Sequence, residues 1–233
     1  MKSVPADLPT VNDGIKDWLN TVSVLRTFYN ISQTSTNNSK NAQAVYAYLS
    51  SAKSFSSSDL TQFQSTFGLP STPINGSSSN EALCLQNNGK TCGEGNLDTQ
   101  YITAIASNTM TYFINDNLGN FATWMASLTA LPVLPLVASI SYGAPEPLQA
   151  LADLLAFDVE AIKLSVMGVT IVAASGDDGA NGPSAVGDPT NCGYAPNFPA
   201  SSQYVLAVGA TSGPGMLSKV RYSSLLKLKS IML

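Results

Sequence analysis

The chain has 233 residues, of which 15 are acidic, 11 are basic and none is histidine. The missing histidine excludes a Ser-His-Asp triad, a Cys-His dyad and every histidine-ligated metal site, so acid–base chemistry is left to carboxylates, Lys, Tyr or Cys. The charged fraction of 11% and the pI of about 4.6 suit a protein that works in acid, and no basic patch favours a nucleic-acid partner.

The first half of the chain is polar and contains short predicted helices. Residues 1–22 have the mixed polar composition of a linker, and residues 43–51 favour a short helix. A second helix is predicted over 58–68, because a Ser-Asp cap precedes it and a glycine ends it. The Ser/Asn/Gly/Pro-rich residues 69–92 predict a loop. Apolar residues at helical spacing predict a third helix over 97–106.

The second half of the chain alternates between apolar strands and helices. The expected strands are 110–114, 136–142, 169–174 and 204–208, and the expected helices are 121–128 and 147–167. Unbroken apolar strands joined by helices indicate a parallel sheet covered on both faces, so we predict an α/β fold. In such folds ligands bind beyond the carboxyl ends of the strands, where the polar loops 143–146 and 175–196 lie.

The C-terminal residues depart from this pattern from about Met216 onward. They contain four of the eleven basic residues, which are Lys219, Arg221, Lys227 and Lys229. A basic amphipathic tail is able to contact a membrane or a protein partner. The alternative is a divergent end, frame-altered or mis-spliced, that is unrelated to the rest of the domain.

The chain has three cysteines, Cys84, Cys92 and Cys192. The first two flank a polar turn, so a local disulfide is one interpretation, and three unpaired buried thiols are the other. No CxxC motif is present, which argues against zinc. If the chain is secreted, Cys192 is left over and calls for a partner outside it.

The sequence also bears on the compartment. Its N-terminal segment lacks the apolar core of a signal peptide, and no run reaches the roughly 18 apolar residues that a membrane span needs. Glycosylation sequons at Asn30, Asn37 and Asn75 lie in Ser/Asn-rich sequence. Together the three sequons favour a secreted glycoprotein.

Two carboxylates stand four residues apart in GEGNLDTQ, at the start of a predicted helix. At this spacing Glu94 and Asp98 share one helix face, with Cβ atoms about 5–6 Å apart. Such a pair lets one carboxyl hold a proton that the other orients. The structural alternative is that acidic residues in a first helical turn simply complement the helix dipole.

A second acidic pair follows the predicted strand 169–174. Asp177 and Asp178 lie in AASGDDGA, where flanking glycines favour a turn. The same position, just past the carboxyl end of a buried strand, also suits a loop that faces a ligand. Both interpretations fit the sequence.

Six ordered segments together resemble a known family. They are VSVLRTFYNIS (22–32), SDLTQFQSTFG (58–68), GEGNLDTQYI (93–102), SISYG (139–143), ASGDDGA (174–180) and NFPASSQYVLAVGAT (197–211). In this order and spacing they are similar to the sedolisins, or serine-carboxyl peptidases, and within them to the tripeptidyl-peptidase I-like members. The resemblance covers about residues 22–213 and implies a subtilisin-like parallel sheet flanked by helices, incomplete at its C-terminus.

The resemblance also implies roles for particular residues. Glu94 would be the general base and acid for the nucleophile, and Asp98 would orient Glu94 and share its proton. Asp177 would point into the oxyanion hole, where a protonated carboxyl donates a hydrogen bond, which requires acidic pH. Ser141, Tyr142 and Gly143 would lie along the substrate backbone.

The chain departs from the family at the nucleophile. The family's serine lies in a GTSAS-type motif, which does not occur here, and Ser212 of GATSG belongs to a preceding segment. The family's calcium site lies near the C-terminus of the domain, so no cofactor is expected in this chain. These departures predict a propeptide remnant or linker at 1–21, a partial peptidase domain at 22–215 and a divergent basic tail at 216–233.

The resemblance therefore implies a serine-type endopeptidase or tripeptidyl-peptidase of acidic pH, inactive in this form because its nucleophile is missing. The alternative is a pseudo-peptidase that binds peptides without cleaving them. We expect a monomer with a peptide or protein substrate and with no nucleic-acid or membrane partner. A lysosome-like or extracellular acidic compartment is expected from the resemblance.

Overall fold

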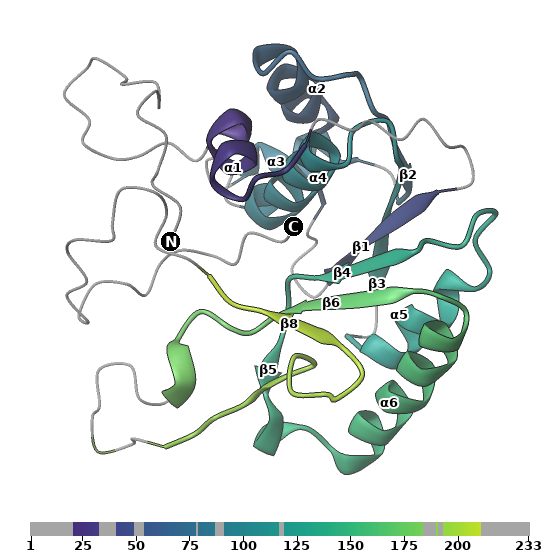
Figure 1. Cartoon of the computed structure of the whole chain (residues 1–233), viewed down its shortest axis with the longest axis vertical. Coiled ribbons are helices and arrows are strands. Elements are labelled where there is room, and N and C mark those ends of the chain that lie inside the picture. The colour runs from purple at the N-terminus through teal and green to yellow at the C-terminus, as the bar shows by residue number, and fades with distance from the viewer. Residues whose placement is uncertain are drawn as a thin grey trace.

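A six-stranded sheet forms the centre of the fold in the computed structural model (Figure 1). The structure describes residues 21–32, 41–48, 54–77, 79–86, 91–116, 119–183, 190 and 193–210. The strand order is β2–β3–β1–β4–β6–β8, and every neighbouring pair is parallel. The strands are β1 (Ala42–Tyr48), β2 (Ile74–Gly76), β3 (Met110–Asp116), β4 (Val137–Ile140), β6 (Thr170–Ala174) and β8 (Leu206–Val208).

Helices cover both faces of this sheet, as the alternation of strands and helices predicted (Figure 1). One face carries α1 (Val22–Phe28), α2 (Ser57–Thr66), α3 (Glu81–Cys84) and α4 (Gly93–Ile105). The other face carries α5 (Phe121–Leu128) and α6 (Leu151–Val166). Short 3-10 turns occur at Glu146–Leu148 and Gly179–Asn181, and β5 (Ala144–Pro145) pairs antiparallel with β7 (Asn197–Phe198). The α/β fold is confirmed.

The central strand β1 explains how the two faces are buried. Val45 packs into a cluster with Phe55, Leu60 and Phe113 on the side of α2 and α4. The next residue, Tyr46, points to the opposite side and packs into the larger cluster against α5 and α6. Because side chains alternate along a strand, a strand buried on both faces is apolar at successive positions, and this gives the sequence no clear alternation.

The prediction of a helix over 43–51 is wrong. Residues 42–48 form β1, which pairs with β3 on one side and β4 on the other. A short apolar run has no periodicity that separates a buried strand from a helix. The β-branched and aromatic residues Val45, Tyr46 and Tyr48 favour the strand.

Several other predicted elements differ from the structure in their boundaries, and three of these differences are large. The predicted loop 69–92 contains the short elements β2 and α3. The helix expected at 97–106 begins earlier, at Gly93, and so includes Glu94. The helix expected over 147–167 is divided, because Gln149 and Ala150 are extended between a 3-10 turn and α6.

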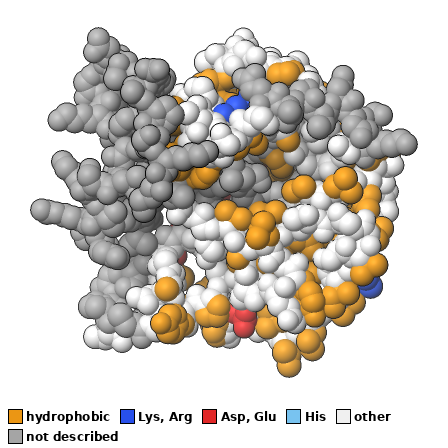
Figure 2. Space-filling view, in the orientation of Figure 1, with side chains coloured by type: hydrophobic (Ala, Val, Ile, Leu, Met, Phe, Trp, Pro, Cys, Tyr) orange, Lys and Arg blue, Asp and Glu red, His pale blue; other side chains and the backbone are white. Residues whose placement is uncertain are grey.

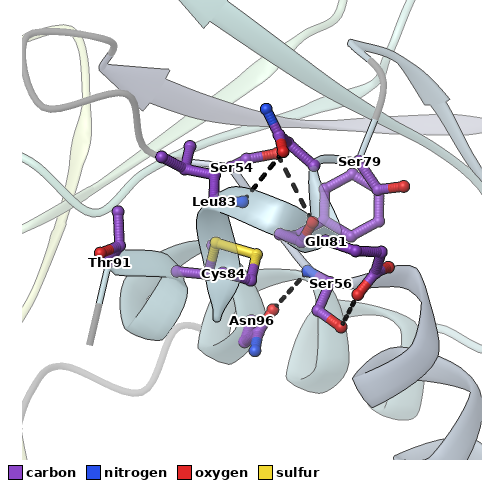
Figure 3. Close-up of a disulfide and its surroundings, with 12 residues drawn as sticks. Ser54, Ser56, Ser79, Glu81, Leu83, Cys84, Thr91 and Asn96 are labelled. Carbon is purple, nitrogen blue, oxygen red and sulfur yellow. Dashed lines mark hydrogen bonds between the residues drawn. A yellow bond between two sulfur atoms is a disulfide. The ribbon is translucent and has the colours of Figure 1, made fainter. Parts of the chain in front are cut away.

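A disulfide joins Cys84 at the end of α3 to Cys92, which occupies the N-cap position of α4 (Figure 3). The two Cα atoms are 5.0 Å apart and the two sulfurs are bonded. The local-disulfide interpretation is therefore confirmed, and the two cysteines are not free thiols. Closing this short loop stabilises the fold by about 2–3 kcal/mol in the chain-entropy model.

Several predictions fall on residues outside the described part of the chain. These are residues 1–20 of the propeptide remnant or linker predicted at 1–21, the sequon at Asn37, Cys192, Ser212 and the basic tail at 216–233. Within the described residues, no helix combines the length and the apolar character that a membrane crossing requires.

Candidate active site

The carboxyl ends of two neighbouring strands open into one cleft. Strand β4 ends at Ile140 and continues into Ser141–Gly143, while β6 ends at Ala174 and continues into the Gly176–Asp177 loop. Between them lies a cavity of about 300 Å³. It is lined by Glu94, Ser141, Tyr142, Gly143, Pro145, Ala174, Ser175, Gly176, Asp177, Asp178, Gly179, Gly182, Pro183, Ala195 and Asn197. This is the edge of a parallel sheet where ligands are expected to bind.

The predicted carboxylate pair lies on the first two turns of α4. Glu94 is half-buried and lines the cleft. Asp98, which is only 9% exposed, lies behind Ser141 and accepts a hydrogen bond of 2.7 Å from the Ser141 hydroxyl. This hydrogen bond connects the carboxylate pair on α4 to the end of β4, although the two residues are more than forty positions apart in the sequence.

Tyr142 adds a neutral group beside these carboxylates. Burial, followed by the nearby charges of Asp98 and Glu94, raises the pKa of the Tyr142 phenol above its ordinary value. Its ring packs edge-on against Tyr46, with centroids 5.5 Å apart, which anchors it to the core. The Tyr142 hydroxyl is thus held protonated next to the acidic pair.

Asp177 and Asp178 enter the cleft from the loop after β6. Asp177 is exposed and Asp178 is half-buried, and both line the cavity. Gly176 just before them has a φ of +103°, a conformation that side-chain-bearing residues rarely adopt. The glycine therefore lets the loop turn sharply at the end of β6 and direct the two aspartates into the cleft.

Asn197 is a cleft residue that the sequence analysis did not single out. A Cβ added to Gly143 would lie 2.5 Å from Asn197 Nδ2, and one added to Gly176 would lie 3.2 Å from the same atom. The carboxamide thus fits between the two strand-end loops because both are glycines at that point. The position of Asn197 in the matched segment 197–211 was the available signal.

The structure brings five of the six predicted site residues into the wall of one cleft, with Asp98 directly behind them. Arg26 and Lys163 are the Lys and Arg residues of the described part of the chain, and neither lines this cavity. Figure 2 shows that blue Lys and Arg side chains are sparse on the face it views. The described part of the chain contains no group of three or more Cys, Asp or Glu residues able to hold a metal ion.

We expect the S141A variant to unfold at a lower urea concentration than the wild-type chain. The substitution removes the hydroxyl that donates to buried Asp98, and weakening the solvation of a buried carboxylate costs about 1–3 kcal/mol. The control is S165A, because Ser165 is exposed on α6. Equal destabilisation by both variants would show that the Ser141 contact does not support Asp98.

No family model matches the chain, but individual relatives do. It is 40% identical over 195 residues to tripeptidyl-peptidase 1 of Dictyostelium discoideum, covering 80% of this chain and 30% of that protein. It is 32% identical over 199 residues to tripeptidyl-peptidase 1 of Homo sapiens, covering 82% of this chain and 34% of that protein. The chain therefore spans about a third of the length of the curated relatives it matches.

A solved structure has a similar fold. Pseudomonas sedolisin, a serine-carboxyl proteinase solved with two molecules of pseudo-iodotyrostatin, superposes with a TM-score of 0.60. The sequence identity is 22%, and the superposition covers 81% of this chain and 52% of that chain. The parallel sheet flanked by helices is thus a subtilisin-like fold of the sedolisin type.

Proposed function

We propose that this chain, which belongs to the sedolisin family and is related to tripeptidyl-peptidase 1, carries part of a serine-carboxyl peptidase site in its cleft. That part consists of the acidic residues of the site. The observation that carries the proposal is the convergence of Glu94, Asp177 and the Ser141–Gly143 segment on one cavity. The substrate class is peptides, and the reaction is hydrolysis of a peptide bond in acid.

In this proposal Glu94 performs the work that histidine performs in other serine peptidases. Its carboxylate takes the proton from a serine hydroxyl as that oxygen attacks the scissile carbonyl carbon, and later returns the proton to the leaving amine. Asp98 lies one turn further along the same helix face and holds Glu94 in the reactive orientation. The hydrogen bond from Ser141 fixes Asp98 in turn.

Asp177 serves the developing oxyanion. A protonated carboxyl donates a hydrogen bond to the negatively charged oxygen of the tetrahedral intermediate, and an ionised carboxylate would repel it. The exposed position of Asp177 on the cleft wall suits this role. This requirement for a protonated aspartate is the reason for an acidic working pH.

The proposed reaction needs a serine nucleophile, and the 233 residues contain no GTSAS-type motif. The test therefore supplies the remainder of a relative. In a chimera, the matched residues of this chain replace their 195-residue counterpart in the Dictyostelium relative. We expect release of a coumarin fluorophore from tri-alanine aminomethylcoumarin at pH 4 and little release at pH 7. A folded chimera that is inactive at every pH would contradict the proposal.

A second candidate is a pseudo-peptidase, in which the same cleft binds peptides without cleaving them. The purified chain alone distinguishes the two at pH 4. Binding of hexaalanine without hydrolysis supports the pseudo-peptidase for this form of the chain. Hydrolysis by the chain alone would contradict it and would require a nucleophile among the residues present.

The disulfide supports folding of the chain in an oxidising compartment. Disulfides form and persist in the secretory pathway and outside the cell, and are rare where glutathione keeps thiols reduced. The sequons at Asn30 and exposed Asn75 agree with that route. We therefore place the proposed activity in a lysosome-like or extracellular acidic compartment.

A further inference from the structure

The short helix α3 connects two helices through opposite ends. At its first residue, the Glu81 carboxylate accepts hydrogen bonds from the hydroxyls of Ser56 (2.7 Å), Ser57 (2.8 Å) and Ser58 (2.9 Å) and from the Ser58 backbone N–H (3.1 Å). Ser56 is the N-cap of α2, so these bonds tie α3 to the start of α2 (Figure 3).

At its last residue, α3 is bonded covalently to the start of α4. Cys84 forms the disulfide with Cys92, and both side chains are buried. Cys92 occupies the N-cap of α4 but makes no side-chain capping hydrogen bond. The covalent bond therefore holds this helix end in place of a polar cap. Glu94 follows only two residues later.

The first turn of α4 is also held directly against α2. Asn96 accepts a 2.7 Å hydrogen bond from the Ser56 backbone N–H and donates a 2.8 Å hydrogen bond to Asp59. Figure 3 shows Ser56, Glu81, Cys84 and Asn96 gathered around the disulfide. We call the set of Glu81, the Cys84–Cys92 disulfide and Asn96 the α3 clamp. Its members attach the helix turn that carries Glu94 to α2 and α3.

We propose that Glu81 and the Cys84–Cys92 disulfide are positioning residues of the peptide site, because together they fix the first turn of α4 and thereby aim Glu94 into the cleft. The inference rests on the proposed function of that cleft. It makes the alignment of the acidic pair dependent on an oxidised chain. In a chain whose disulfide is reduced, the sheet stays folded but the Glu94 side chain is no longer held in its position in the cleft.

The clamp also retains its charge in acid. The hydrogen bond from Ser56, with those from Ser57 and Ser58, lowers the pKa of Glu81 to about 2 from an ordinary 4.5. Asp59 on α2 is the other carboxylate in the cluster, joined through Asn96. A folded-state pKa below the ordinary value gives stability that is fully present above about pH 4.5 and is lost as the pH falls through about 2.

The E81Q variant tests whether the charge of Glu81 stabilises the clamp in acid. We expect its melting temperature to lie about 1–4 °C below that of the wild-type chain at pH 5, as for other charges at helix N-termini. The difference should shrink as the pH is lowered from 4.5 to 2.5, because Glu81 of the unfolded wild-type chain takes up a proton in this range while the folded carboxylate, with a pKa of about 2, stays largely ionised. A difference that stays constant across that range would show that the charge of Glu81 does not hold the clamp.

The positioning role is tested on the full chain at 10 °C and pH 4.5. Calorimetry gives the Kd of hexaalanine for the wild-type chain, C84S/C92S, E81Q and two controls. The controls are E160Q, a matched change on α6, and C192S, which removes only the third cysteine. NMR with 13C-labelled glutamate adds a local signal, because the chain has four glutamates, Glu81, Glu94, Glu146 and Glu160.

We expect C84S/C92S to weaken peptide binding about tenfold and E81Q to weaken it severalfold, with no change in the controls. The carboxyl signal of Glu94 should move in both variants while those of Glu146 and Glu160 stay in place. Lower stability with an unchanged Kd and an unchanged Glu94 signal would overturn the inference. If C84S/C92S does not fold, E81Q decides with the same readouts. Failure of the wild-type chain to bind hexaalanine would instead overturn the proposed function, while the Glu94 signal still reports on the clamp.

Discussion

Replacing Glu94 by glutamine in the active chimera is expected to lower kcat by about 10²–10⁴-fold, the range for loss of a general acid–base group. This corresponds to about 3–5 kcal/mol of transition-state stabilisation. Gln is nearly isosteric with Glu and still lines the cleft, but it cannot accept the serine proton. Stopped assays at saturating peptide measure kcat, and KM should change little because substrate contacts remain.

The matched control for this experiment is E160Q, because Glu160 lies on α6 and pairs with Lys163 away from the cleft. We expect E160Q to retain the kcat of the parent chimera. If E94Q also retains it within twofold, Glu94 is not the group that accepts the proton. The proposed roles of Glu94 as the proton acceptor and Asp98 as the residue that orients it would then be wrong.

Replacing Gly95 by alanine is expected to destabilise the chain by about 1–3 kcal/mol, as overpacking does. A Cβ at Gly95 would clash with the carbonyl oxygen of Ser54 and lie 3.2 Å from Cζ of Phe113. Ser54 and Phe113 are both buried, and Phe113 belongs to the sheet strand β3, so neither has free space into which to move. The first turn of α4 must shift instead, which displaces Glu94 and Asp98.

Gly93 offers a control in the same turn, because a Cβ there meets no atom within 4 Å. The G93A variant should be neutral or more stable by up to about 1 kcal/mol, since alanine loses less backbone entropy than glycine in a helix. Urea unfolding of both variants measures the contrast. Equal stability of G93A and G95A would show that α4 does not pack on Ser54 as described.

The sequence predicted the α/β fold because its strands are apolar throughout and its helices intervene. It failed at β1, where six of the seven residues are buried, so the strand lacks the alternation of buried and exposed residues that identifies a strand. It also failed at α3, a single turn whose stability comes from Asn80 capping, Glu81 and the disulfide, and not from helical periodicity. Such elements depend on contacts with residues distant in sequence.

The residues of the candidate site were more predictable than the contacts that hold them in place. Glu94, Asp98 and the 139–143 and 174–180 segments were identifiable by spacing and by family resemblance. Their meeting in one cleft follows from the parallel pairing of β4 with β6. No local sequence pattern predicts side-chain contacts between distant segments. Three features of the site depend on such contacts: the hydrogen bond of Ser141 to Asp98, the position of Asn197 between two glycines, and the α3 clamp.

The most direct test of the central claim is NMR titration of the full chain with hexaalanine at pH 4.5. If the cleft is a peptide site, the backbone amide signals of Ser141, Gly143 and Asp177 should shift together with one Kd. Signals from α2 and from the outer face of α6 should stay in place. Saturable shifts confined to those distant surfaces, or no shifts at any peptide concentration, would contradict the assignment of this cleft as a peptidase site.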